Sequence, residues 1–138
     1  MNLDDIDRKI LDVLSKDSRL AFTDIAGRLK LSEGTVRRRV QSLLESGVIK
    51  RFTIETWEES LKALVLVSTT PAIPTSQIAE RILRLDGIDS AFEVAGQYDI
   101  SVIVSGENIA AINQCIDSIR GIEGVETTNT LFVLRKWR

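Results

Sequence analysis

The sequence predicts an α+β protein, with a small helical domain followed by a larger domain that alternates strands and helices. Three observations support this prediction. Apolar residues recur at the spacing of amphipathic helices over residues 6–44. Short apolar runs then alternate with helical patterns over residues 61–134. Between these parts, residues 55–60 (ETWEES) are polar and acidic, as expected of a linker.

Three short helices are expected in the first 50 residues. The first has apolar residues at helical spacing over 6–14, and acidic residues at 4–7 favour its start. A second begins near Thr23. A third follows Ser32, whose hydroxyl can cap the first turn, and ends before Gly47, which can adopt a left-handed conformation. Because only a few residues separate the last two helices, the pattern predicts a helix-turn-helix unit.

Positive charge is concentrated in this unit, although the whole chain has a net charge of −2. Residues 28–51 contain seven basic and two acidic side chains. On a helical wheel, Arg38 lies almost opposite the apolar stripe of the third helix, and Arg37 and Arg39 flank that stripe. This local charge on an acidic protein indicates a patch with a partner.

The outer face of the third helix suits the major groove of DNA. Arginine and glutamine can read base edges, while hydroxyls and flanking cations contact phosphates. An ordinary solvated face is the alternative, but the helix pair, the cap, the stripe and the charge together favour double-stranded DNA. The predicted DNA-binding residues are Ser32, Gly34, Thr35, Arg37, Arg38, Arg39, Gln41, Ser42, Lys50 and Arg51.

The domain boundaries follow from these patterns. Residues 1–50 form the helix-turn-helix domain, and residues 51–60 form a hinge strand and linker. Lys50–Ile54 alternates like a strand, which could be a wing beside DNA or the start of the next domain. Residues 61–138 form the second domain.

The second domain is expected to have the order βαββαβ, which is the ferredoxin-like arrangement. Thr75 or Ser76 is expected to cap its first helix, and Gly87 to end it. The second helix carries Ile109, Ile112, Ile116 and Ile119 on one face. The expected strands span 61–69, 89–95, 99–105 and 125–134, and the expected helices span 75–85 and 108–120.

Both faces of the predicted sheet are apolar, which indicates self-association. In the first strand Leu64 and Leu66 point to one face and Val65 and Val67 to the other. We assign Val65 and Val67 to the face that the helices leave open. An exposed apolar face requires a cover, and a second copy of the sheet would supply one as a symmetric dimer. Trp137 is expected to be a packing anchor.

Composition disfavours catalysis. The absence of histidine excludes His-dependent triads and most zinc-enzyme ligand sets, so we expect no enzyme, metal or cofactor. The single cysteine, Cys115, is expected in the core and cannot form an internal disulfide. No apolar run approaches the roughly 18 residues of a membrane span, and the acidic N-terminus does not resemble a signal peptide. We therefore expect a cytoplasmic protein.

Six motifs along the chain carry a family resemblance. They are LDDIDRKIL at 3–11, DIA at 24–26, LSxGTVxxRV at 31–40, SGVI at 46–49, GQYD at 96–99 and TTNT at 127–130. In this order and spacing they resemble the Lrp/AsnC family of leucine-responsive and related transcription regulators. Within that family the chain is similar to archaeal members, including those tied to lysine biosynthesis.

The resemblance implies a winged-helix DNA-binding domain, a hinge strand and a ferredoxin-like regulation domain. It implies homodimers that assemble into tetramers or octamers, with an amino-acid effector between dimers. Gln97 departs from the family motif, which carries Glu or Asp there, so the effector is open, with lysine as the first guess and glutamine as the next. The implied effector-binding residues are Gly96, Gln97, Tyr98, Asp99, Thr127, Thr128, Asn129 and Thr130.

The predicted function is a sequence-specific DNA-binding transcription regulator whose DNA binding or assembly responds to a small amino acid. Three alternatives remain. A ligand-independent DNA-packaging protein would use the same helices. An amino-acid-binding module or small enzyme on a ferredoxin-like fold would leave the basic helix without a role. An RNA binder is disfavoured, because strands 61–69 and 99–105 lack the aromatic residues that stack bases.

Overall fold

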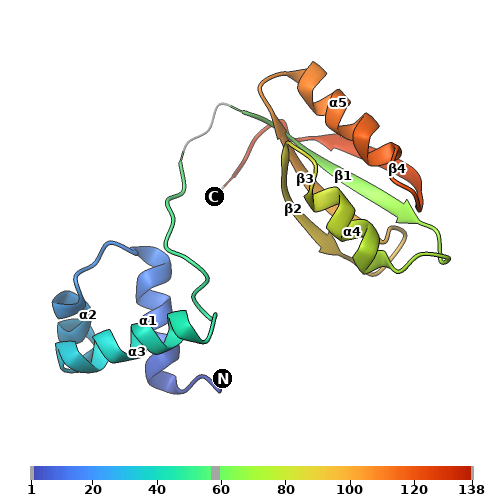
Figure 1. Cartoon of the computed structure of the whole chain (residues 1–138). Coiled ribbons are helices and arrows are strands. Elements are labelled where there is room, and N and C mark those ends of the chain that lie inside the picture. The colour runs from blue at the N-terminus through green and yellow to red at the C-terminus, as the bar shows by residue number, and fades with distance from the viewer. Residues whose placement is uncertain (1, 57–59, 138) are drawn as a thin grey trace. The chain divides into compact units, whose positions relative to one another are not determined.

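The computed structural model describes residues 2–56 and 60–137. The chain divides into two compact units between residues 56 and 57, and this division falls inside the predicted linker (Figure 1). Within that linker, Trp57, Glu58 and Glu59 lie outside the described residues. None of the helices in the described part has the length and hydropathy needed to cross a membrane.

The first unit consists of three helices: α1 (Asp5–Lys16), α2 (Phe22–Leu29) and α3 (Glu33–Glu45). Their apolar faces meet in one core, as the helical periodicity predicts. The predicted ends of α3 are confirmed. The Ser32 hydroxyl accepts a hydrogen bond from the Thr35 N–H at 3.1 Å, and Gly47 has a φ of 73°, which a side chain would disfavour.

The strand expected at Lys50–Ile54 is not formed among the described residues. Residues 50–56 are assigned to no helix or strand, and Phe52 and Ile54 are exposed. A strand needs a neighbour to satisfy its N–H and C=O groups, and none of the described segments pairs with this one. The alternating pattern was therefore not sufficient to predict a paired strand here.

The second unit has the predicted order βαββαβ. Its four strands form one antiparallel sheet with the order β2-β3-β1-β4, which confirms the ferredoxin-like arrangement (Figure 1). The elements are β1 (Leu61–Thr69), α4 (Thr75–Leu83), β2 (Ile88–Glu93), β3 (Ile100–Gly106), α5 (Ile109–Arg120) and β4 (Val125–Phe132).

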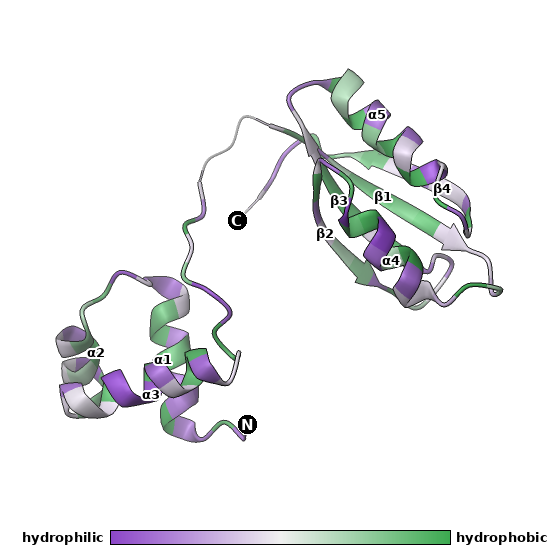
Figure 2. Ribbon diagram, viewed as in Figure 1, coloured by the Kyte–Doolittle hydropathy of each residue, from purple (hydrophilic) through white to green (hydrophobic). Residues whose placement is uncertain are grey.

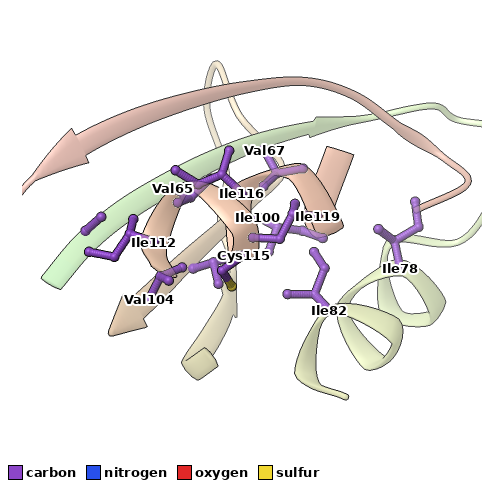
Figure 3. Packing of buried hydrophobic residues seen from close by; sticks show 12 residues of the cluster. Val65, Val67, Ile78, Ile82, Ile100, Val104, Ile112, Cys115, Ile116 and Ile119 are labelled. Carbon is purple, nitrogen blue, oxygen red and sulfur yellow. The ribbon is translucent and has the colours of Figure 1, made fainter. Parts of the chain in front are cut away.

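Helices α4 and α5 both cover one face of this sheet. The buried isoleucines of both helices point toward the strands, and Val65 and Val67 of β1 are fully buried beneath them (Figure 3). Assigning Val65 and Val67 to the open face was therefore wrong. Strict alternation shows that two faces exist, but the helix positions decide which of them is covered.

The opposite face of the sheet is covered by no described element of this unit, and we call it the outer face. Leu64 lies at its centre, directly opposite Ile103 on β3 and Leu131 on β4. β1 is hydrophobic along most of its length (Figure 2). The apolar residues of the outer face are Leu64, Leu66, Phe92, Ile103 and Leu131.

Several details at helix ends differ from the predictions. Pro74, not Thr75 or Ser76, occupies the N-cap position of α4, and no side chain caps that helix. The helix ends at Leu83, and Gly87 lies in the turn beyond it with a φ of 84°. Ile109 is 58% exposed because it stands in the first turn of α5, beyond the edge of the core.

Trp137 is 78% exposed, and the guanidinium of Arg135 lies 5.2 Å from the centre of its ring. The expectation of a packing anchor is therefore not met within the described residues of the single chain.

Cys115 is buried, as predicted. Burial, followed by the nearby Asp86 carboxylate, raises the pKa of its thiol, which disfavours the reactive thiolate.

Candidate nucleic-acid interface and ligand site

The turn between α2 and α3 sets the position of α3. Lys30 adopts a left-handed conformation with a φ of 55°, and the Leu31 N–H closes the end of α2 by donating to the Ala26 carbonyl at 2.9 Å. The chain then enters α3 at the Ser32 cap. Three residues, 30–32, therefore join two helices that pack on each other, which is the geometry of a helix-turn-helix.

The exposed face of α3 presents the groups that the sequence predicted. Gly34, Arg38 and Gln41 are exposed, while Val36, Val40 and Leu43 are buried on the opposite side. Hydrophilic and hydrophobic residues alternate along the α3 ribbon (Figure 2). Arg38 has no hydrogen bond or ion pair with any described residue, so its guanidinium is available to a partner. The Gln41 amide donates to the Glu45 carboxylate at 3.0 Å.

Arg37 is held at the edge of this face. Its guanidinium pairs with the Glu33 carboxylate one turn earlier and lies 5.2 Å from the centre of the Phe22 ring on α2. These contacts restrict Arg37 to the flank of α3, where a cation would meet a phosphate more readily than a base edge.

The remaining predicted DNA-binding residues lie at the two ends of α3. At the N-terminus, the hydroxyls of Ser32 and Thr35 are hydrogen-bonded to each other at 2.8 Å. Ser42 is half-buried on the flank opposite Arg37. Lys50 and Arg51 are exposed beyond the C-terminus of α3.

Arg39 does not share the exposed face. Its Nη1 donates to the carboxylates of Asp4 and Asp7 at the start of α1, and its side chain is only 25% exposed. The hydrogen bond from the Asp7 N–H and then the Arg39 guanidinium hold the pKa of Asp4 below its ordinary value. The DNA contact expected of Arg39 therefore stays a prediction, and the structure shows this side chain paired with α1. The wheel position, between the stripe and the open face, could not reveal these acidic partners.

The predicted effector hairpin connects β2 to β3. The Val94 N–H donates to the Asp99 carbonyl at 2.9 Å across the loop, and Gly96 has a φ of 141°, which favours glycine. The Asp99 Oδ2 accepts from the Thr69 N–H at 2.7 Å and from the Thr69 hydroxyl at 3.2 Å. Its Oδ1 has no partner among the described residues, so one acceptor remains for a ligand.

The four polar residues of β4 do not form one cluster, because their side chains alternate across the sheet. Thr128 and Thr130 lie opposite the buried Val67 and Val65, on the helix-covered face. The Thr128 hydroxyl there accepts from the Arg120 Nε at 2.9 Å. Only Thr127 and Asn129 reach the outer face.

Two hydrogen bonds join the outer-face residues to their neighbours. The Thr127 hydroxyl donates to the Ser68 hydroxyl at 3.0 Å, and the Asn129 amide donates to the Tyr98 hydroxyl at 3.2 Å. Ser68 and Thr69 were missed by sequence reasoning, since only the strand register brings the end of β1 beside the hairpin. Exposed Gly96 and Gln97 form the tip of the hairpin. We call Ser68, Tyr98, Asp99, Thr127 and Asn129 the polar group.

A helix-turn-helix unit with an exposed arginine on α3, followed by a ferredoxin-like unit with a cluster of polar side chains, is typical of a DNA-binding protein that carries a separate ligand-binding domain. Residues 3–50 match winged helix-turn-helix DNA-binding domains, and residues 62–138 match the Lrp/AsnC ligand binding domain. The chain therefore belongs to the Lrp/AsnC family. It is a transcription regulator and not an enzyme, as predicted.

Curated relatives match nearly the whole chain. The HTH-type transcriptional regulator LysM of Saccharolobus solfataricus is 47% identical over 137 residues, which cover 99% of this chain and 96% of the relative. The HTH-type transcriptional regulator FL11 of Pyrococcus furiosus is 36% identical and covers 96% and 90% of the two chains. The predicted resemblance to archaeal members of the family is confirmed.

Solved structures share the fold. A feast or famine regulatory protein from M. tuberculosis, complexed with L-methionine, superimposes with a TM-score of 0.88 at 26% identity, covering 99% of this chain and 95% of that chain. E. coli AsnC superimposes with a TM-score of 0.81 at 24% identity, covering 99% and 95%. Among the described residues, no three or more of the side chains that commonly bind metals (His, Cys, Asp and Glu) are grouped so that they could hold a metal ion.

Proposed function

We propose that this regulator reads a specific DNA sequence with the exposed face of α3 and that Arg38 contacts a base. The observation that carries this proposal is the contrast among the three arginines. Arg37 is engaged with Glu33 and Phe22, and Arg39 is engaged with Asp4 and Asp7. Arg38 alone of the three has no described partner, and a guanidinium can form two hydrogen bonds with a guanine edge.

Arg38→Ala is expected to weaken binding to the preferred site by about 1–3 kcal/mol and to relax selectivity at one base position. Lys50→Ala serves as the control, because loss of a phosphate contact should weaken all sequences alike and reduce the salt slope by about 0.9. Fluorescence anisotropy with the selected site and with random duplexes, at fixed salt, measures both effects. An unchanged ratio of specific to random affinity in Arg38→Ala would show that Arg38 reads no base.

The same comparison separates regulation from packaging. A DNA-packaging protein should bind selected and random duplexes with similar affinity, whereas a specific regulator should prefer its site by about 10³-fold or more. The acidic remainder of the chain favours the second case, since it limits non-specific attraction to DNA.

We also propose that two chains associate through the outer face of the sheet, and that such dimers assemble further into tetramers or octamers. Leu64 and its cross-strand neighbours Ile103 and Leu131 form an apolar patch there, and an identical patch on a second copy is its simplest complement. A two-fold dimer presents two α3 helices. Its binding site should be a near-palindrome with half-sites separated by about one helical turn or a multiple of it.

We propose that the ligand is a free amino acid, bound at the polar group and the hairpin tip. The free Oδ1 of Asp99 can accept from an α-ammonium, and the Ser68 hydroxyl and the second N–H of the Asn129 amide can donate to a carboxylate. The L-methionine in the related M. tuberculosis protein supports the class of ligand. Gln97 at the hairpin tip supports a polar side chain, with lysine and then glutamine as candidates. Since the polar group borders the outer face, binding there can shift assembly or DNA affinity if the two states bind the ligand differently.

Titration calorimetry with each of the twenty amino acids at millimolar concentration tests this site. We expect heat from one or a few polar amino acids, and loss of that heat in Asp99→Asn. Asparagine keeps an oxygen for Thr69 but removes the negative charge that an ammonium requires. Arg38→Ala is the control and should bind the amino acid unchanged. No heat and no thermal shift with any amino acid would contradict amino-acid sensing.

A further inference from the structure

We infer that Arg39, Asp4 and Asp7 form a positioning network that fixes α3 on α1, so that DNA affinity depends on two aspartates that touch no DNA. The inference rests on the proposed role of α3 as the helix that reads DNA. It assigns to this acidic pair a function in the orientation of that helix.

Asp4 and Asp7 each use one carboxylate oxygen to cap α1 and the other to bind Arg39. The Asp4 Oδ1 accepts from the Asp7 N–H at 2.8 Å, and the Asp7 Oδ2 accepts from the Asp4 N–H at 3.3 Å, which together form the capping box of α1. The second oxygen of each carboxylate, Asp4 Oδ2 and Asp7 Oδ1, accepts from the Arg39 Nη1, in the case of Asp7 at 3.1 Å. The same pair of carboxylates thus begins α1 and holds α3.

Burial makes this network sensitive to the loss of any member. The Asp7 side chain is only 2% exposed, so its charge depends on Arg39 and the Asp4 N–H for compensation. The carboxylates also raise the pKa of the Arg39 guanidinium above its ordinary value, so the cation persists at any physiological pH. Because both carboxylates accept from the same guanidinium nitrogen, these charge-assisted hydrogen bonds fix how α3 lies against the start of α1.

The network lies one residue from the proposed base contact. Arg38 and Arg39 are adjacent on α3, about 100° apart around the helix axis. A rotation or shift of α3 that follows loss of the Arg39 contacts therefore moves Arg38 relative to the DNA. The Arg39 Nη1 is occupied by Asp4 and Asp7, and its Nε is buried without a described partner, so only Nη2 is left for another group.

Asp7→Asn gives the sharpest test, because simple electrostatics and the network predict opposite results. Removal of a negative charge should strengthen attraction to DNA if Asp7 acts only through charge. If Asp7 positions α3, the side-chain amide of the new asparagine instead places an N–H donor against the donors of Arg39 or Asp4. The contact that fixes α3 on α1 is then weakened. Asp5→Asn is the matched control, since Asp5 is an exposed aspartate in the same helical turn with no described partner.

Anisotropy is measured on the full chain at a temperature where circular dichroism shows every variant folded. We expect Asp7→Asn to lower affinity for the preferred site by about tenfold, the effect of one misaligned base contact. Asp5→Asn should bind as tightly as the parent or more tightly. Equal or stronger binding by folded Asp7→Asn would overturn the inference.

The salt dependence distinguishes positioning from direct contact. Arg39→Ala should weaken binding while leaving the slope of log affinity against log salt unchanged, because no phosphate contact is lost. A slope reduced by about 0.9, as expected for Lys50→Ala, would make Arg39 a phosphate contact and overturn the inference. If Arg38→Ala does not alter selectivity, the proposed reading face itself fails, which is a separate result from failure of the network.

Discussion

Val67→Asp should prevent the second unit from folding. Val67 is fully buried between the sheet and the helices α4 and α5, within the apolar core cluster of the second unit. Loss of the valine contacts costs about 1.5–3 kcal/mol, and an unpaired polar group adds at least about 2 kcal/mol, more if charged. Because a domain of this size is stable by roughly 4–12 kcal/mol, the sum removes most or all of that stability.

The neighbouring position supplies the control. Leu66→Asp introduces the same side chain one residue earlier, on the outer face, where it can reach solvent in the single chain. Circular dichroism and thermal unfolding should show Leu66→Asp folded and Val67→Asp largely unfolded in the second unit. A cooperatively folded Val67→Asp, with unchanged melting temperature, would contradict the assignment of Val67 to the covered face.

Leu64→Asp should separate the subunits while leaving each chain folded. Leu64 lies at the centre of the outer face, between Ile103 and Leu131, so in a face-to-face dimer two carboxylates would be buried close to each other. Loss of the dimer removes the second α3 from the DNA complex. Since joining two binding modules raises affinity by about 10²–10⁴-fold, we expect binding to a near-palindromic site to fall by about 100-fold or more.

Sedimentation and anisotropy measure both parts of this prediction. Leu83→Asp is the control, because Leu83 is a leucine of the second unit that is 52% exposed and stands on α4 rather than on the sheet. It should keep the parent mass and affinity. A Leu64→Asp chain that sediments like the parent would exclude the outer face as the dimer surface.

Most of the secondary structure was readable from the sequence, because helices and strands impose local periods. The bounds of β1 agree with the apolar run at 61–69. As predicted, Ser32 caps the start of α3, and Gly47 follows its end. The motifs at 3–11, 31–40 and 96–99 supported the family, which the comparisons then showed. These are properties of short segments, so they needed no knowledge of distant contacts.

The candidate sites were readable only in part. The outward position of Arg38 follows from the helical wheel. The register of β4 against β1 was needed to show that Thr127 and Asn129 lie on the outer face and Thr128 and Thr130 on the covered face. The contribution of Ser68 also depends on that register. Polar residues that are consecutive in a strand alternate between faces, so a run of four cannot line one pocket.

By itself, then, the sequence determined the order of elements, the apolar stripe of α3 and the existence of two apolar sheet faces. Only the tertiary structure decided that Val65 and Val67 lie under the helices while Leu64 and Leu66 stay open. Only the tertiary structure brought Arg39 to the aspartates more than thirty residues earlier. The physical reason is the same in both cases: periodicity specifies the direction of a side chain relative to its own element, whereas its partner depends on how separate elements pack.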